Sequence, residues 1–228
     1  MSWKGNNYCS KSLTLVVSAL NQAGASKFLD FLLNITKMKT LPRTGWISHG
    51  VSLHDVESVA DHTFSSCAIS MLLTDLERKR GVRVNIVRVL RMAILHDLSE
   101  SLTFDISKAY LDYLGRRGEA IKAELERAAW NHLIRAIKHS DIVREYTNLQ
   151  DEFLARKTIE SKIVHAADGL DILLQVINYN RRGYPPTILR DLWKSTTRNL
   201  RGSNIPSVRK LHAMIVKENK ILDQSMVK

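Results

Sequence analysis

The chain has 228 residues, of which 44% are hydrophobic and 25% charged, an average globular composition that argues against disorder along the whole length. Only 10 glycines and 4 prolines are present, so many short strands joined by tight turns are not expected and long helices are favoured. The formal net charge is +11, but the basic residues are scattered and not interleaved with aromatics, so we expect no dedicated nucleic-acid surface.

The N-terminal segment, residues 1–26, is a weakly patterned leader. Its best apolar run, residues 13–20, is shorter than the roughly 20 residues that cross a bilayer. Polar residues such as Asn6 and Ser10 interrupt the region where a signal peptide would be continuously apolar. We therefore expect a cytoplasmic protein with no membrane association.

Apolar residues recur at helical spacing along most of the remaining chain. The first such segment is 27–37, and Pro42 and Gly45 then break the pattern, with a loop to about residue 56. The period predicts further helices at 57–80, 84–100, 119–138, 158–180, 187–200 and 206–223. We expect an all-α helical bundle, with a main domain at residues 27–180 and a C-terminal helical extension at residues 181–228.

A histidine and two carboxylates share one face of the predicted helix 84–100. His96 and Asp97 lie in its apolar part, where burying an unpaired ionised carboxylate would cost several kcal/mol. Glu100 follows four residues after His96, so the three side chains project in roughly the same direction. This arrangement indicates a cationic partner such as a metal ion. A simple His–Asp hydrogen bond with a surface glutamate is the alternative.

Two more polar residues fall within apolar helical patterns. His62 is in phase with the inward positions of segment 57–80, although a lone histidine there is more often a core residue. Asp168 lies in the middle of segment 158–180, where aspartate has a low helix propensity and a desolvation cost. Asp171 lies one turn further on, and periodicity does not choose between the two aspartates.

Two imidazoles and two carboxylates make a mixed nitrogen and oxygen ligand set. Such a set suits one divalent ion such as Mn, Co, Fe or Zn, rather than an ion selected by thiolates. Four protein ligands leave positions open on an octahedral ion for water and substrate. The sequence therefore predicts a metal centre that contains His62, His96, Asp97 and one of the two aspartates of segment 158–180.

Several motifs in this order resemble the HD-domain superfamily and, within it, the 5′-deoxynucleotidase branch that includes the YfbR-type enzymes. The motifs are Arg43-Thr44-Gly45-Trp46, Glu57-Ser58-Val59-Ala60-Asp61-His62, His96-Asp97-Leu98-Ser99-Glu100, Asp105-Ile106 and Asp168. The resemblance covers about residues 27–180 and implies an HD-domain helical bundle. It also implies that His62, His96, Asp97 and Asp168, rather than Asp171, hold a single divalent metal.

The resemblance implies roles for four further residues. Glu100 matches a catalytic carboxylate, and Asp105 matches a further acidic residue of the site. Arg43 matches the arginine that meets the phosphate, and Trp46 matches the tryptophan beside the sugar. One position departs from the family, because Phe104 stands where a glycine usually precedes this aspartate. Phenylalanine adopts a positive φ only at a cost, so we expect the loop that holds Asp105 to differ.

The implied function is release of phosphate from deoxyribonucleoside 5′-monophosphates, with the nucleotide as partner and a homodimer suggested by the resemblance alone. The rival enzymes are an HD-type nucleoside triphosphohydrolase or phosphodiesterase and a binuclear HD oxygenase. A nucleic-acid-binding helical protein with a vestigial site is the alternative from another class. The other histidines have simpler interpretations: His54 lies in a loop, His132 and His139 do not make a second metal site, and His165 packs in the core.

Overall fold

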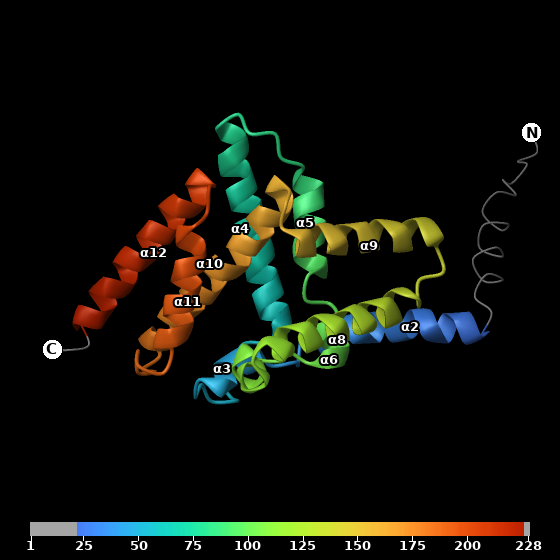
Figure 1. The fold of residues 1–228 in the computed structure, drawn as a ribbon, viewed down its shortest axis with the longest axis horizontal. Coiled ribbons are helices and arrows are strands. Elements are labelled where there is room, and N and C mark those ends of the chain that lie inside the picture. The colour runs from blue at the N-terminus through green and yellow to red at the C-terminus, as the bar shows by residue number, and fades with distance from the viewer. Residues whose placement is uncertain (1–21, 226–228) are drawn as a thin grey trace, which may run out of the picture.

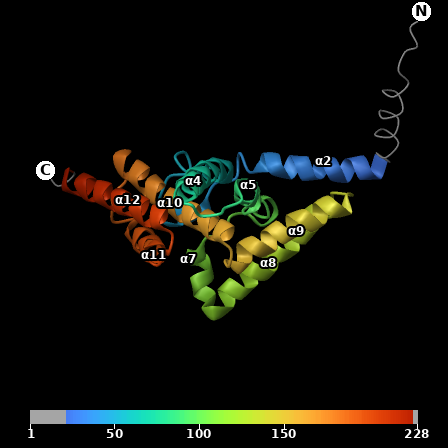
Figure 2. The ribbon, with the colours of Figure 1, turned by 90° about the horizontal axis from the view of Figure 1, so that it is seen from above.

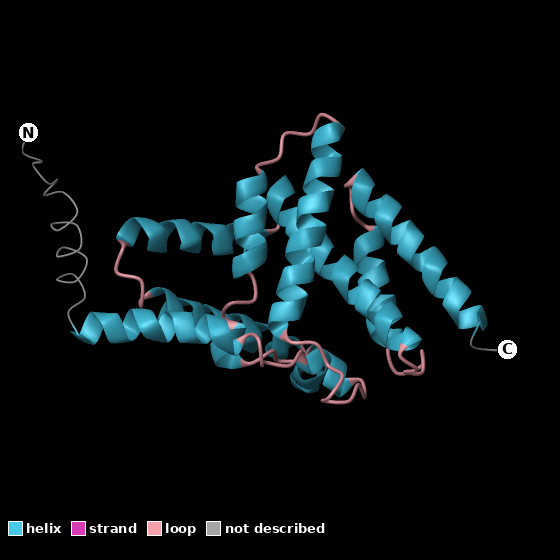
Figure 3. Cartoon of the chain, turned by 180° about the vertical axis from the view of Figure 1, so that it is seen from behind, coloured by secondary structure: helices cyan, strands magenta, loops and turns pink. Residues whose placement is uncertain are grey.

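The computed structural model describes residues 22–225, and between these limits the protein is built from helices and connecting loops (Figures 1 and 3). The β-type pairing in this range is an isolated bridge between Pro42 and Ser58. The all-α expectation is confirmed. None of the helices from residue 22 to residue 225 is both long and apolar enough to cross a bilayer. The expected leader falls outside the described residues, except for 22–26.

The helices follow one another along the chain with short connections. Their bounds are α2 Gln22–Lys37, α3 Thr44–Ser48, α4 Val59–Lys79, α5 Ile86–Leu95, α6 Glu100–Thr103, α7 Lys108–Leu111, η1 Asp112–Leu114, α8 Arg116–Ile134, α9 Ser140–Ala155, α10 Ile159–Arg181, α11 Arg190–Arg201 and α12 Pro206–Ser225.

Helix α10 is the central element of the fold, and it packs against α4, α5, α9, α11 and α12 (Figures 1 and 2). Its apolar residues Ile163, Ala167, Leu170 and Ile177 are at most 3% exposed. Burial of a large aliphatic side chain stabilises the fold by about 1.5–3 kcal/mol. These contacts therefore fix α10 in place, and with it the polar residues on its other faces.

Helix α4 crosses α10 and begins at a defined cap. The hydroxyl of Ser58 accepts a hydrogen bond from the Asp61 backbone, and the Asp61 carboxylate accepts one from the Ser58 backbone. Such a reciprocal capping box satisfies two backbone donors that the first helical turn leaves without partners. His62 is the next residue, so the cap fixes the position of its side chain relative to α10.

Helices α11 and α12 lie beside α10 at the end of the molecule away from α9 (Figure 1). Leu200, Ile205 and Val208 from this region are at most 5% exposed and belong to the same hydrophobic core as α4, α5 and α10. Residues after 180 therefore pack on the main core. The division of the chain at residue 180 stays a prediction.

Three local expectations were wrong. Helix α5 ends at Leu95, so residues 96–99 form a turn before α6 rather than a continuous helix to residue 100. Helix α9 occupies residues for which no helix was expected, and the predicted loop from residue 41 to residue 56 contains α3. The turn after Leu95 matters most, because it lets His96, Asp97 and Glu100 approach one point from a bend instead of from a straight helical face.

Candidate metal centre and active site

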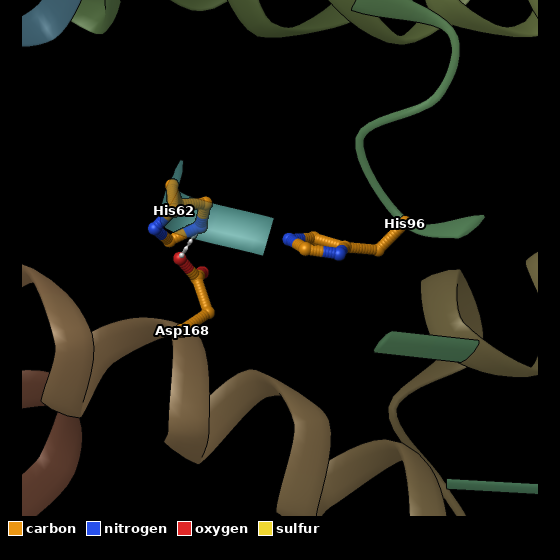
Figure 4. A group of neighbouring side chains, drawn as sticks. All are labelled: His62, His96 and Asp168. Carbon is orange, nitrogen blue, oxygen red and sulfur yellow. Dashed lines mark ion pairs between the residues drawn. The ribbon is translucent and has the colours of Figure 1, made fainter. Parts of the chain in front are cut away.

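The four residues predicted to hold a metal come together from three places in the fold. His62 lies in the first turn of α4, His96 caps the end of α5, Asp97 follows it, and Asp168 lies in the middle of α10. Nε2 of His62 is 3.2 Å from Oδ1 of Asp168 and 3.6 Å from Oδ2 of Asp97. Figure 4 shows His96 directed toward the pair made by His62 and Asp168.

The donor atoms of this cluster suit a cation. The ligand atoms of His62, His96 and Asp168 all lie within 4.8 Å of one another. Nδ1 of His96 lies 2.8 Å from the carbonyl oxygen of Ala93, and because a carbonyl only accepts, Nδ1 carries the proton and donates it. In the neutral ring Nε2 of His96 then carries the lone pair, and this atom is buried with no hydrogen-bond partner among the described residues, 3.2 Å from Oδ2 of Asp97. A buried lone pair beside carboxylates is what a divalent metal would occupy.

The electrostatics of the cluster also favour positive charge. Burial and Arg43 act to lower the pKa of His62, but Asp168 and Asp171 raise it to about 10. Burial disfavours ionisation of Asp168, but His62 and His96 lower its pKa to about 2. Burial acts in the same way on Asp97, whose pKa is nevertheless held well below its usual range, chiefly by His96. Two carboxylates that stay ionised beside the buried histidines create the negative field that a divalent cation needs.

Arg43 joins the cluster to two further acidic residues. Its Nη1 lies 3.0 Å from Oδ2 of Asp97 and 3.8 Å from Oε2 of Glu100, and its Nε lies 3.8 Å from Oδ2 of Asp105. The Arg43 side chain is 14% exposed, so water screens these pairs weakly. The structure thus places every predicted site residue except Trp46 around this guanidinium or the two histidines.

The charged form of Glu100 is disfavoured in this site. It is 5% exposed, and its Oε2 has no hydrogen-bond partner among the described residues. Burial and then the nearby Asp97 raise its pKa well above the usual range, although Arg43 opposes them. A carboxyl group with a raised pKa in a polar site is a candidate for proton transfer.

Asp105 is held by a backbone conformation that the sequence argued against. Phe104 has φ of 60° and ψ of 161°, a region favoured by glycine, and its side chain is 67% exposed. The backbone carbonyl of Asp105 accepts a hydrogen bond from the hydroxyl of Thr44, which ties this loop to α3. Phe104 thus adopts the positive φ that is costly for phenylalanine, and the expectation that this loop differs from that of the family stays a prediction. The phenylalanine takes the strained conformation and its ring points into solvent.

Trp46 was expected on the loop that runs to about residue 56, but it lies in α3. It is 2% exposed, its indole Nε1 donates to Oε1 of Glu57 at 2.7 Å, and its ring meets Tyr179 edge-on with centroids 5.1 Å apart. These contacts belong to a second apolar cluster that includes Val51 and Val176. The contact with a sugar stays a prediction.

The two competing aspartates of α10 both contact His62, at opposite nitrogens. Asp168 is next to Nε2, and Oδ2 of Asp171 lies 2.7 Å from Nδ1. Asp168 is 31% exposed at its side chain and Asp171 is 8% exposed. The sequence did not separate the two because both positions point from α10 toward the same residue of α4.

The remaining histidines do not reach the cluster. His54, His132 and His139 are exposed, and Asp55 beside His54 forms an ion pair with Arg182. His165 packs as expected: its ring stacks on Phe153 with centroids 4.0 Å apart, and its Nε2 lies 2.8 Å from the carbonyl oxygen of Phe153.

A cavity of about 250 Å³ opens beside the cluster, and several of its residues were not foreseen from the sequence. Its lining comprises His96, Asp97, Ser99, Glu100, Lys122, Glu126, Gln150, Phe153, Leu154, Arg156 and His165. Nζ of Lys122 lies 3.3 Å from the carbonyl of Ile106 and 3.5 Å from Glu126. Lys122 and Glu126 are four residues apart on α8, a spacing so common on helix surfaces that it gave no signal.

The comparison with protein families agrees with this geometry. A family model described as HD domain matches residues 35–206 of the chain. A protein from Xenopus laevis named 5′-deoxynucleotidase HDDC2 is 31% identical over 176 residues, which are 77% of this chain and 80% of that protein. The human protein of the same name is 29% identical over 173 residues, 76% of this chain and 78% of the relative.

A solved structure has a similar fold over nearly all of its own length. The PH0347 protein from Pyrococcus horikoshii superposes with a TM-score of 0.68 and is 26% identical. The superposition covers 82% of this chain and 97% of that protein. The similarity therefore extends over most of the described helices and is not confined to the residues around the two histidines.

Proposed function

Because this chain belongs to the HD domain family, we propose that it is a metal-dependent 5′-deoxynucleotidase, which releases phosphate from deoxyribonucleoside 5′-monophosphates. The observation that carries the proposal is the convergence of His62, His96, Asp97 and Asp168 beside a buried Glu100 and Arg43. Similar proteins named 5′-deoxynucleotidase, matched over most of the chain, support this substrate class.

In this proposal the metal ligands are Nε2 of His62, Nε2 of His96, and the carboxylates of Asp97 and Asp168. A divalent cation bound by these residues would supply Lewis acidity toward a phosphoryl oxygen and toward the attacking water. Apolar walls from α4, α5 and α10 surround the two histidines, which are at most 6% exposed. Because little water reaches the two histidines, charge interactions at their rings are stronger than at the protein surface.

Two cations of the chain are placed to offset phosphate charge. Arg43 presents a planar set of N–H donors next to Asp97, and its burial keeps that set in one orientation. Lys122 lines the same cavity as Asp97 and Glu100. Negative charge that accumulates on the phosphoryl oxygens during hydrolysis is stabilised by such pre-oriented donors.

Proton transfer is assigned to Glu100, with Asp105 as the second acidic group. Proton transfer is most efficient when the pKa of the group lies near the working pH, and burial moves Glu100 in that direction. Arg43 lies between the two carboxylates, 3.8 Å from each. One group takes the proton of the attacking water at a carboxylate oxygen, and the other protonates the leaving 5′-oxygen of the nucleoside.

The test is a screen of the purified chain, reconstituted separately with Mn, Co, Fe, Zn and Mg ions, against nucleoside mono-, di- and triphosphates. Release of inorganic phosphate chiefly from deoxyribonucleoside monophosphates is expected. Release of pyrophosphate or of tripolyphosphate would favour the rival triphosphohydrolase. Elemental analysis should find about one divalent ion per chain in wild type and none in His96→Ala, and full activity in metal-free protein would contradict the proposal. The cytoplasmic location and the homodimer stay predictions.

A further inference from the structure

Two carboxylates of helix α10 contact His62, one at each nitrogen of its ring. Its Nε2 lies 3.2 Å from Oδ1 of Asp168, and its Nδ1 lies 2.7 Å from Oδ2 of Asp171. The His62 side chain is fully buried, and the Asp171 side chain is 8% exposed, so little water reaches the second contact. The 2.7 Å separation is short for an N–H to oxygen hydrogen bond, as is usual when the acceptor is ionised.

The two nitrogens of an imidazole diverge, so a metal ion bound at one leaves the other free for a hydrogen bond. Asp97, Asp168 and the ring of His96 all lie on the Nε2 side of His62. A carboxylate at Nδ1 keeps the proton on that nitrogen and turns the Nε2 lone pair toward these groups. Asp168 and Asp171 are three residues apart on α10, so the packing of one helix sets both contacts.

We propose that Asp171 is a positioning residue of the metal centre, which holds His62 in its Nδ1–H form so that Nε2 binds the metal. The proposal rests on the metal centre of the proposed function, but not on the identity of the substrate. It gives a role to a residue that the ligand set itself does not include.

A neighbouring carboxylate suggests the main rival arrangement. Ligand atoms of Glu57, His62 and Asp171 also lie within 4.8 Å of one another, on the Nδ1 side of the ring. Glu57 is already engaged, because its Oε1 accepts from the indole of Trp46 and its backbone N–H donates to the hydroxyl of Tyr179 at 3.1 Å. These bonds direct Glu57 toward α3 and the end of α10, and they favour Nδ1 as a hydrogen-bond donor over Nδ1 as a ligand.

The first measurement is zinc affinity in Asp171→Asn, determined without nucleotide by competition with a chromophoric chelator. Loss of a carboxylate that orients a ligating histidine typically weakens metal binding 10–100-fold, and we expect this range. The matched control is Glu77→Gln on the same helix as His62, because Glu77 is 2% exposed and accepts hydrogen bonds from the backbone N–H and hydroxyl of Ser207. The control should lose stability and keep wild-type zinc affinity.

The second measurement needs no substitution in the site. In zinc-loaded wild-type protein with ¹⁵N-labelled histidine, the Nδ1 of His62 should retain a slowly exchanging proton, while Nε2 shows the shift of a ligated nitrogen. Zinc bound at Nδ1 would overturn the proposal, as would wild-type zinc affinity in Asp171→Asn or an equal loss in Glu77→Gln. All readouts are taken without nucleotide, so they decide the role of Asp171 separately from the substrate assignment.

Discussion

Nη1 of Arg43 lies 3.0 Å from Oδ2 of Asp97, a residue 54 positions further along the chain. This ion pair joins the segment before α3 to the turn after α5, and its guanidinium also faces Glu100 and Asp105 at 3.8 Å each. Four charged groups thus share one buried site. Removal of the guanidinium would leave three acidic groups without their cation, and such groups are expensive to bury alone.

Arg43→Lys should be nearly as damaging as Arg43→Ala. A lysine ammonium is a single point charge and cannot face three carboxylates and a phosphate with separate N–H groups. In the proposed mechanism Arg43 contacts phosphate in both the bound state and the transition state, so we expect the loss chiefly in kcat/KM. Steady-state kinetics of the two variants on one deoxynucleotide decides the matter, and a lysine variant close to wild type would contradict it.

Glu100→Gln should keep the metal and lose turnover. Glutamine has the shape of the protonated side chain but cannot transfer a proton, so a fall in kcat of about 10²–10⁴-fold is expected. The charged form of Glu100 is disfavoured by burial and by Asp97, so the neutral amide should leave the melting temperature unchanged or raise it. If metal content falls together with activity, Glu100 is a ligand and its assignment to proton transfer is wrong.

Trp46→Ala tests two expectations at once. Truncation of a buried tryptophan usually costs about 3–5 kcal/mol, so a clear loss in denaturant stability is expected. If the residue also excludes a 2′-hydroxyl, the ratio of kcat/KM for deoxyadenosine and adenosine monophosphates should narrow in the folded variant. An unchanged ratio would limit Trp46 to packing on Tyr179 and to its hydrogen bond with Glu57.

Phe104→Gly should stabilise the protein. A non-glycine residue at φ of 60° and ψ of 161° costs on the order of 1–3 kcal/mol, and the exposed ring offers little packing in return. Glycine loses about 0.5–1 kcal/mol to the entropy of the unfolded chain, so a net gain of about 1 kcal/mol is expected. Urea denaturation of the two proteins measures it. A lower free energy of unfolding in the glycine variant would show that the Phe104 side chain makes a stabilising contact.

His165 should make stability depend on pH. Burial lowers its pKa to about 4, whereas an unfolded histidine titrates near 6.5. Between these values the unfolded state binds the proton more tightly, so stability is fully present above about pH 6.5 and falls as the pH drops toward 4. Metal-free wild type should lose up to about 3 kcal/mol more than His165→Gln over this window. Parallel stability curves for both proteins would contradict this assignment.

The sequence predicted the number and identity of most long helices because their apolar period is strong. The segment 158–180 gave α10 almost residue for residue, since Thr158 caps its start and the basic Arg181 and Gly183 mark its end. Helix α9 was missed although Ile142, Tyr146, Leu149 and Phe153 recur at helical spacing within its largely polar sequence. Its contacts with α5 and α10 bury Leu149, Gln150 and Phe153 and stabilise the helix.

The candidate site was anticipated as a set of residues, but its geometry was not. Periodicity placed His96 and Glu100 on one straight helical face, whereas a turn after Leu95 brings them together. The sequence could not distinguish Asp168 from Asp171, because the two differ in which nitrogen of His62 they contact, and only the structure shows this. Phe104 illustrates the same limit, since its strained backbone is tolerated where Thr44 and Arg43 both hold the next residue, Asp105.

The wide separation of the ligands along the chain has a consequence for biosynthesis. His62 and Asp168 are about 100 residues apart, and a ribosome that adds roughly 5–20 residues per second needs on the order of 5–20 s between them. During that interval the nascent chain holds the two histidines and Asp97 without the helix that completes the set. In the proposed centre the complete ligand set therefore exists only after α10 has emerged and docked on α4, so the folded pocket presents all four ligands to a metal ion.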